Sequence, residues 1–235
     1  MPPRDAVRLV LAGLLLMAVN HVSAQEVVLA PPGTEGWRPL LLPRVERTTA
    51  YVPFEVEGVQ GVRSKSRCSA SALVLPLDGV DLLRTPRLSW RWRVLEALSI
   101  EDERVKSGDD FAARVYVTFP FVREGTGVWE RMRQRVAESL FGEQVPGSAL
   151  NYVWSSSEPA GATWDNPFTA QSKMISLGPG PVGRWQDAEV DVRADYLALF
   201  GREPPKPSGI ALMTDSDNSC GRASAEFAAF RASGT

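Results

Sequence analysis

Histidine is almost absent from this 235-residue sequence, whose only example is His21. We expect residues 1–24 to be removed, which leaves residues 25–235 without any histidine. Ser-His-Asp and Cys-His nucleophile systems are therefore excluded, as are histidine-ligated zinc and iron sites. Any catalysis would have to use carboxylates, Tyr, Lys, Arg or a cation held by oxygen ligands.

Basic runs and nucleotide motifs are also missing. The formal net charge is −2, and lysine and arginine are dispersed along the chain. Such a balance argues against nucleic acid as the main partner. The chain has no glycine-rich phosphate loop, no Gly-x-Ser-x-Gly elbow and no dinucleotide fingerprint.

A long apolar run is missing as well. The longest, Leu9 to Val19, is too short for a bilayer, which needs about 20 residues. Arg4 and Arg8 precede it, the small-residue pattern Val22-Ser23-Ala24 follows it, and no cysteine comes next to accept a lipid. The pattern predicts a signal peptide over 1–24, and hence a periplasmic or secreted protein that does not span the membrane.

Only two cysteines are present, Cys68 and Cys220. In an oxidising compartment they could form one disulfide, and the alternative is two separate buried thiols. A bridge would tie an early strand to the stretch 209–219.

Alternation of apolar and polar residues dominates the rest of the chain. Leu88, Trp90, Trp92 and Val94 share one face of a predicted strand, which places both tryptophans in the core. The segment 110–119 alternates in the same way. The pattern predicts strands near 26–30, 50–57, 62–75, 88–94, 110–119, 149–155, 172–177, 187–192, 209–214 and 223–230.

Two segments have the spacing of helices, 128–140 and about 193–200, and each is followed by a glycine. Many short strands with few helices indicate an all-β fold, a β-sandwich of jelly-roll type with one or two short edge helices. We expect residues 25–49 to form an N-terminal arm with the first strand, and 50–235 to form a single β-sandwich domain.

A ligand face is predicted if strands 88–94 and 110–119 are neighbours. Aromatic rings stack on sugar rings, while Arg and Asp hydrogen-bond to hydroxyl groups. The alternative is a solvated face with cross-strand ion pairs worth about 0.2–1 kcal/mol each. The candidate ligand-binding residues are Arg93, Asp110, Arg114, Tyr116, Trp154 and Asp215.

The stretch GIALMTDSDNS, residues 209–219, has three interpretations. It could be the turn that ends a buried strand, with Asp and Asn capping backbone N–H groups. It could be a calcium loop with Asp215, Asp217 and Asn218 as ligands, although the EF-hand pattern does not match. It could also supply Asp215 or Asp217 as one carboxyl of a catalytic pair with Asp109 or Asp110, since glycoside hydrolysis needs two carboxyl groups about 5–5.5 Å or 6.5–9.5 Å apart.

Several motifs in order resemble the bacterial domain-of-unknown-function family 3047, over about residues 50–230. The resemblance implies an exported bacterial protein without an established activity, so it assigns no catalytic residue. The motifs are W-R-W-R-V (90–94), G-D-D-F-A-A-R-V-Y-V (108–117), N-Y-V-W (151–154), G-R-W-Q-D-A-E-V-D-V-R-A-D-Y (183–196) and G-I-A-L-M-T-D-S-D-N (209–218).

The leading functional hypothesis is a non-enzymatic module that binds a glycan or a similar polar ligand, with a Ca²⁺ ion at the rim as an option. One alternative is a carboxylate-dependent enzyme acting on polysaccharide. Another is an envelope-associated structural protein, which would present an apolar patch of several hundred Å².

Overall fold

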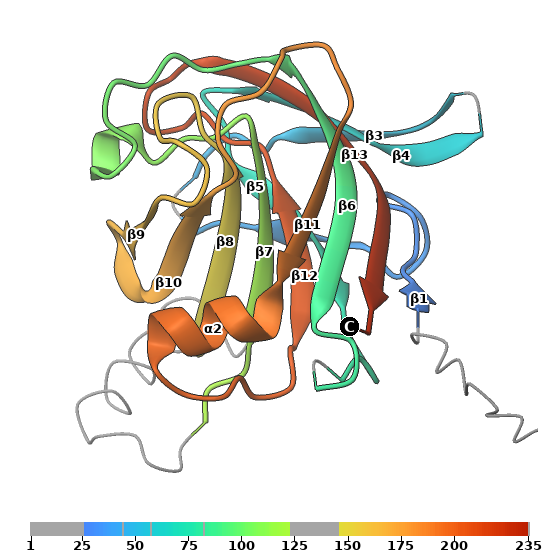
Figure 1. Cartoon of the computed structure of the whole chain (residues 1–235). Helices are drawn as coiled ribbons and strands as arrows, with labels where there is room; N and C mark the ends of the chain where they lie inside the picture. The colour runs from blue at the N-terminus through green and yellow to red at the C-terminus, as the bar shows by residue number, and fades with distance from the viewer. Residues whose placement is uncertain (1–25, 44, 57, 82, 123–145, 235) are drawn as a thin grey trace, which may run out of the picture.

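The computed structural model describes residues 26–43, 45–56, 58–81, 83–122 and 146–234 (Figure 1). In this part of the chain two sheets face each other, and one short α-helix lies at an end of the sandwich. The strands are β1 (Glu26–Val28), β2 (Arg38–Leu41), β3 (Ala50–Val56), β4 (Val59–Arg67), β5 (Ser71–Pro76), β6 (Arg87–Glu96), β7 (Ala113–Phe119), β8 (Ser148–Trp154), β9 (Thr163–Asn166), β10 (Thr169–Ser176), β11 (Gln186–Asp191), β12 (Gly209–Met213) and β13 (Arg222–Ser233).

The described strands form a six-stranded and a seven-stranded sheet. Sheet A has the order β11-β6-β13-β4-β3, with β1 also paired to β13, and sheet B has the order β2-β5-β12-β7-β8-β10-β9. All neighbouring strands are antiparallel except β8 and β10. The predicted all-β sandwich of jelly-roll type is confirmed.

Three of the crossovers between the two sheets run through residues 68–70, 97–112 and 214–221. They join β4 to β5, β6 to β7 and β12 to β13. Since β13 is antiparallel to β4 and β6, and β12 to β5 and β7, all three lie at one end of the sandwich. We call it the crossover end; it lies at the top of Figure 1.

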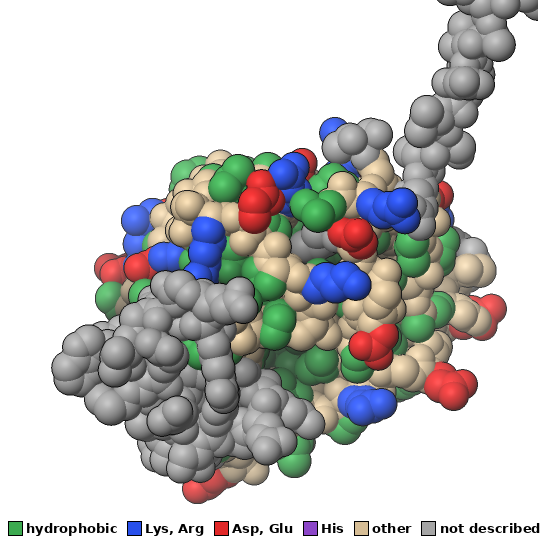
Figure 2. Space-filling view, turned by 90° about the horizontal axis from the view of Figure 1, so that it is seen from below, with side chains coloured by type: hydrophobic (Ala, Val, Ile, Leu, Met, Phe, Trp, Pro, Cys, Tyr) green, Lys and Arg blue, Asp and Glu red, His purple; other side chains and the backbone are tan. Residues whose placement is uncertain are grey.

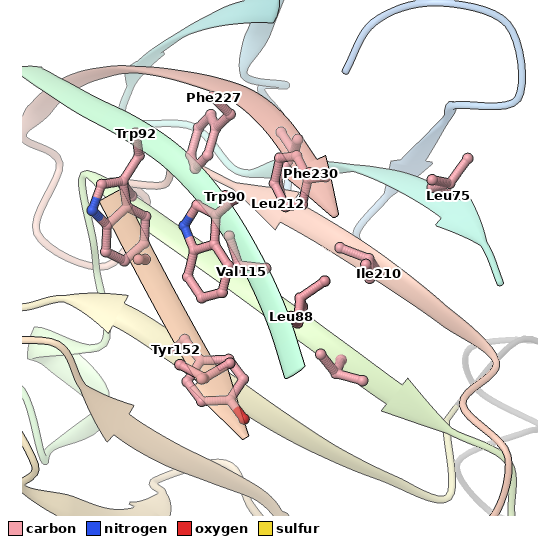
Figure 3. Close-up of a cluster of buried hydrophobic side chains, with 14 of the residues drawn as sticks. Leu75, Leu88, Trp90, Trp92, Val115, Tyr152, Ile210, Leu212, Phe227 and Phe230 are labelled. Carbon is pink, nitrogen blue, oxygen red and sulfur yellow. The ribbon is translucent and has the colours of Figure 1, made fainter. Parts of the chain in front are cut away.

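The core lies between the sheets and follows the alternation of the sequence. Trp90 and Trp92 of β6 are 1% and 2% exposed, as predicted, and pack edge to face with ring centroids 5.4 Å apart. Trp90 also stacks on Phe230 of β13, and Tyr152 reaches the same cluster from sheet B (Figure 3). Each large apolar side chain buried in this way stabilises the fold by about 1.5–3 kcal/mol.

The helix α2 (Val192–Phe200) covers the other end of the sandwich and agrees with the helix predicted at 193–200. The Asp191 side chain accepts a hydrogen bond from the Ala194 N–H at its start, and Gly201 ends it with a φ of 69°. Tyr196 packs against Phe119, with ring centroids 4.6 Å apart. The helix predicted at 128–140 lies outside the described residues.

Two details of the strand prediction are wrong. The segment 62–75 is not one strand, because Cys68 has a φ of 45° and the chain turns there from sheet A into sheet B. In addition, β2 and β9 have no counterpart in the prediction. Among the described residues, no helix is long and apolar enough to cross a membrane.

The surface seen from the α2 end carries lysine, arginine, aspartate and glutamate side chains interspersed with one another (Figure 2). Charges of one sign do not gather into a large patch among the described residues on this face. Mixed charge of this kind agrees with the net charge of −2.

Candidate functional site

Arg114 is the centre of a buried group of polar residues at the crossover end. It lies on β7, on the face of sheet B that points away from the core. Its Nε donates to Asp215 Oδ1 at 2.8 Å, its Nη2 contacts Asp215 Oδ2, and its Nη1 donates to Asp109 Oδ1 at 3.2 Å. The three residues are 3%, 0% and 5% exposed. Their ion pairs are therefore shielded from water. The attraction between opposite charges is strongest in such a desolvated place.

Asp110 fastens the crossover 97–112 to the crossover 214–221. Its carboxylate accepts hydrogen bonds from the Asn218 backbone N–H at 3.1 Å, from Asn218 Nδ2 at 3.1 Å and from the Ser219 N–H at 2.6 Å. Asp110 itself is 1% exposed. We call Asp109, Asp110, Arg114, Asp215, Asp217 and Asn218 the crossover cluster.

A disulfide between Cys68 and Cys220 fastens the third crossover to the same end. It joins residues 152 positions apart and confirms the predicted bridge between an early strand and the stretch 209–219. All three crossovers are thus tied together, two of them by Asp110 and two by the disulfide.

The charges of the crossover cluster do not balance, because four carboxyl groups surround one guanidinium. Burial raises the pKa of Asp109, and the charge of Arg114 offsets part of that rise. Burial also raises the pKa of Asp217, and the neighbouring Asp110 carboxylate raises it further. One carboxylate oxygen each of Asp110, Asp215 and Asp217 lies within 4.8 Å of the others. Oxygen ligands of this kind suit Ca²⁺, and the predicted calcium site stays a prediction.

Of the predicted ligand residues, the structure brings Asp110, Arg114 and Asp215 together but leaves them almost no exposed surface. Tyr116 lies beside them on the same face of β7, half-buried, and its ring is 5.7 Å from the Arg114 guanidinium. Trp154 was predicted wrongly to share this face. It pairs with Ala113 on the core-facing side of sheet B and is 5% exposed.

Arg93 was also predicted wrongly to lie beside Arg114. The prediction assumed that strands 88–94 and 110–119 are neighbours, whereas β6 belongs to sheet A and β7 to sheet B. Arg93 instead lies on the outer face of sheet A. Its Nε and Nη2 donate to Glu226 Oε2 at 2.7 and 2.5 Å, while the Nε and Nη2 of Arg63 donate to Glu226 Oε1 at 2.8 and 2.6 Å.

Two aromatic side chains lie over this row of charges. Trp185, immediately before β11, has the guanidinium carbons of Arg91 and Arg93 at 5.3 and 4.9 Å from its ring. Phe54 of β3 approaches Trp185 from the other edge of the sheet, with ring centroids 6.3 Å apart. Both rings are half-buried, and Glu226, which Arg93 contacts on its other side, is 0% exposed.

Next to Trp185 the outer face of sheet A is hollowed into a groove of about 350 Å³. A bulge forms its floor, because Ala229 has a φ of 56° and the β13–β6 register shifts between Ala228 and Arg231. We call this space the outer groove. The residues that line it are Ser89, Trp90, Arg91, Asp187, Ala188, Glu189, Ala229 and Arg231.

The sequence analysis missed Trp185 and Glu226, although each had a signal. The alternation of the strand predicted at 187–192 begins two residues earlier than that prediction. It places Trp185, Asp187 and Glu189 on one face, and Gln186, Ala188 and Val190 on the other. Glu226 is the one acidic residue in the apolar stretch 223–230. A carboxylate inside such a stretch needs a cationic partner.

The family comparison agrees with the resemblance seen in the sequence. The family described as a protein of unknown function (DUF3047) matches residues 35–231. The chain belongs to the DUF3047 family. No curated protein matches this DUF3047 sequence.

Solved structures similar to the DUF3047 chain are distant. A family 11 carbohydrate-binding module from Clostridium thermocellum, in complex with a mixed-linked tetrasaccharide, has 10% identity and a TM-score of 0.42, over 88% of this chain and 94% of that one. A variant of the Cel12A cellulase of Rhodothermus marinus has 10% identity and a TM-score of 0.40, over 90% and 100%. Endoglucanase 3 from Trichoderma harzianum has 8% identity and a TM-score of 0.41, over 90% and 97%.

Proposed function

We propose that this protein is an exported, non-enzymatic module that binds a glycan or a similar polar ligand in the outer groove. One observation carries the proposal: half-buried Trp185 contacts Arg91, which lines the groove together with its ion-pair partner Asp187. Aromatic rings can stack on sugar rings, and fixed Arg and Asp side chains can bond to hydroxyl groups.

Export is supported by the disulfide between Cys68 and Cys220, since disulfides persist in oxidising compartments. It is also supported by the signal-peptide pattern of residues 1–24. A periplasmic or secreted location would bring the groove into contact with extracytoplasmic glycans.

The enzymatic alternative depends on Asp110 and Asp215, and their surroundings do not favour it. Their carboxylate oxygens approach within 4.8 Å, so distance does not rule out a pair. However, both side chains are buried and accept hydrogen bonds from the protein. A general acid or nucleophile has to contact its substrate, so we place the crossover cluster in a structural role.

The test is native electrophoresis of the purified protein through gels that contain a panel of polysaccharides, with released sugars assayed in the same lanes. We expect retardation by at least one polysaccharide without product. Trp185→Ala should abolish the retardation, because it removes the ring beside the groove. Trp164→Ala is the matched control, since Trp164 is also half-buried but belongs to sheet B. Product formation, or retardation that survives Trp185→Ala, would contradict the proposal.

A further inference from the structure

Most of the charges described on the outer face of sheet A pair one to one. Most arginines near the outer groove have a carboxylate of their own, as in the pairs Arg91–Asp187, Arg87–Glu189 and Arg231–Glu26. Arg63 and Arg93 instead share Glu226. One positive charge is therefore left over, and it lies where Arg93 contacts Trp185.

Both arginines keep a donor edge that Glu226 does not use. Each directs Nε and Nη2 at one carboxylate oxygen, and neither Nη1 donates a hydrogen bond to any part of the chain that the structure describes. The side chains of Arg63 and Arg93 are 42% and 28% exposed, whereas that of Glu226 is 0% exposed. Fixed guanidinium groups with a free edge are well suited to an oxyanion.

A second cation lies on the same face of the sheet. Lys65 is two residues from Arg63 on β4, so both side chains point outward, and Lys65 is exposed. Its cross-strand neighbour on β13 is Ser224, which carries no charge. Arg63 and Lys65 on β4 and Arg93 on β6 thus give this face a local surplus of positive charge, although the chain as a whole has a net charge of −2.

We infer that the ligand of the outer groove is an acidic glycan, with a uronic-acid carboxylate held by the Nη1 edges of Arg63 and Arg93. The sugar ring would lie against Trp185, and the neutral part of the chain would continue along Ser89 and Asp187. The inference rests on the proposed function and adds the substrate class. Glu226 then acts as a positioning residue that fixes the two guanidinium groups before the ligand arrives.

The experiment compares two forms of one polysaccharide, polygalacturonate and its carboxyl-reduced neutral derivative, by calorimetric titration of the purified protein. A charge-assisted pair of hydrogen bonds predicts about tenfold tighter binding of the acidic form. That preference should shrink as the salt concentration rises. Arg63→Gln should remove most of the preference.

The control is Arg222→Gln on β13, which removes a more exposed arginine of the same sheet that pairs with Glu96. It should keep the preference. Equal affinity for the acidic and neutral forms would overturn this inference and leave the proposed function standing. If neither form binds, the protein is tested against the full polysaccharide panel. Failure to bind any polysaccharide of that panel would overturn the proposed function as well. A preference that persists in Arg63→Gln and Arg93→Gln would place the anion elsewhere and contradict the assignment.

Discussion

The crossover cluster and the outer groove contain the same residue types, arginine and aspartate, in different roles. In the first, Arg114 and Asp215 are 3% and 0% exposed and hydrogen-bond within the protein. In the second, Arg91 and Asp187 have 37% and 82% of their side-chain surface exposed and line a groove. Burial decides the difference, because a desolvated ion pair holds segments together whereas an exposed one contributes little to stability and can contact a ligand.

The largest effect is expected from breaking the buried pair. Arg114→Gln leaves the Asp215 carboxylate buried without its cation, which should lower the free energy of unfolding by about 3–5 kcal/mol. Urea denaturation would measure this loss of stability. Arg91→Gln is the matched change in the groove and should cost less than about 1 kcal/mol. Equal losses in the two variants would remove the distinction between the regions.

The next largest effect is expected from the disulfide. Cys68→Ala combined with Cys220→Ala removes the covalent tie between two crossovers and should lower the free energy of unfolding by about 2–4 kcal/mol. Thermal and urea unfolding, with and without reductant, would measure it. The double variant should be insensitive to reductant and should keep its affinity for polysaccharide, since the groove lies on another face. Loss of binding in the folded variant would connect the crossover end with the ligand.

The smallest effect concerns the pH dependence of the crossover cluster. The pKa of Asp217 is raised in the folded protein, so the folded state binds more protons just above the ordinary value of 3.8. Stability should therefore fall as pH rises through the raised pKa. Asp217→Asn removes this loss and should stabilise the protein at pH 7 by about 0.5 kcal/mol or less, with no gain below pH 3.8.

The same variant also tests the predicted calcium site. With calcium present, loss of a ligand would make Asp217→Asn less stable than the parent protein, and a chelator would abolish that difference. A thermal melt with calcium and with chelator separates the two outcomes. Destabilisation that depends on calcium would replace the structural role of the crossover cluster with a cation site.

The sequence located most of the strands but did not assign them to sheets. Alternation located β6 and β7 and placed Trp90 and Trp92 in the core, because a strand with one buried face repeats every two residues. Alternation does not say which strands pair, so Arg93 and Arg114 were placed on one face when they belong to different sheets. Trp154 was misplaced because β8 is buried on both faces and shows no polar side.

The candidate site was harder to predict because it depends on contacts between distant segments. Glu226 is 163 residues from Arg63 and 133 from Arg93. Trp185 meets Phe54 only because opposite edges of sheet A approach each other. The disulfide was predictable as one of two options, since the chain has only two cysteines and an apparent export signal.

The most direct measurement is amide hydrogen exchange of the purified protein with and without the polysaccharide that retards it. The account predicts added protection in β11 and in the facing parts of β6 and β13, which line the outer groove, and unchanged exchange in residues 109–114 and 214–219. Protection confined to those two crossover segments would contradict the account, because it would place the ligand at the crossover cluster.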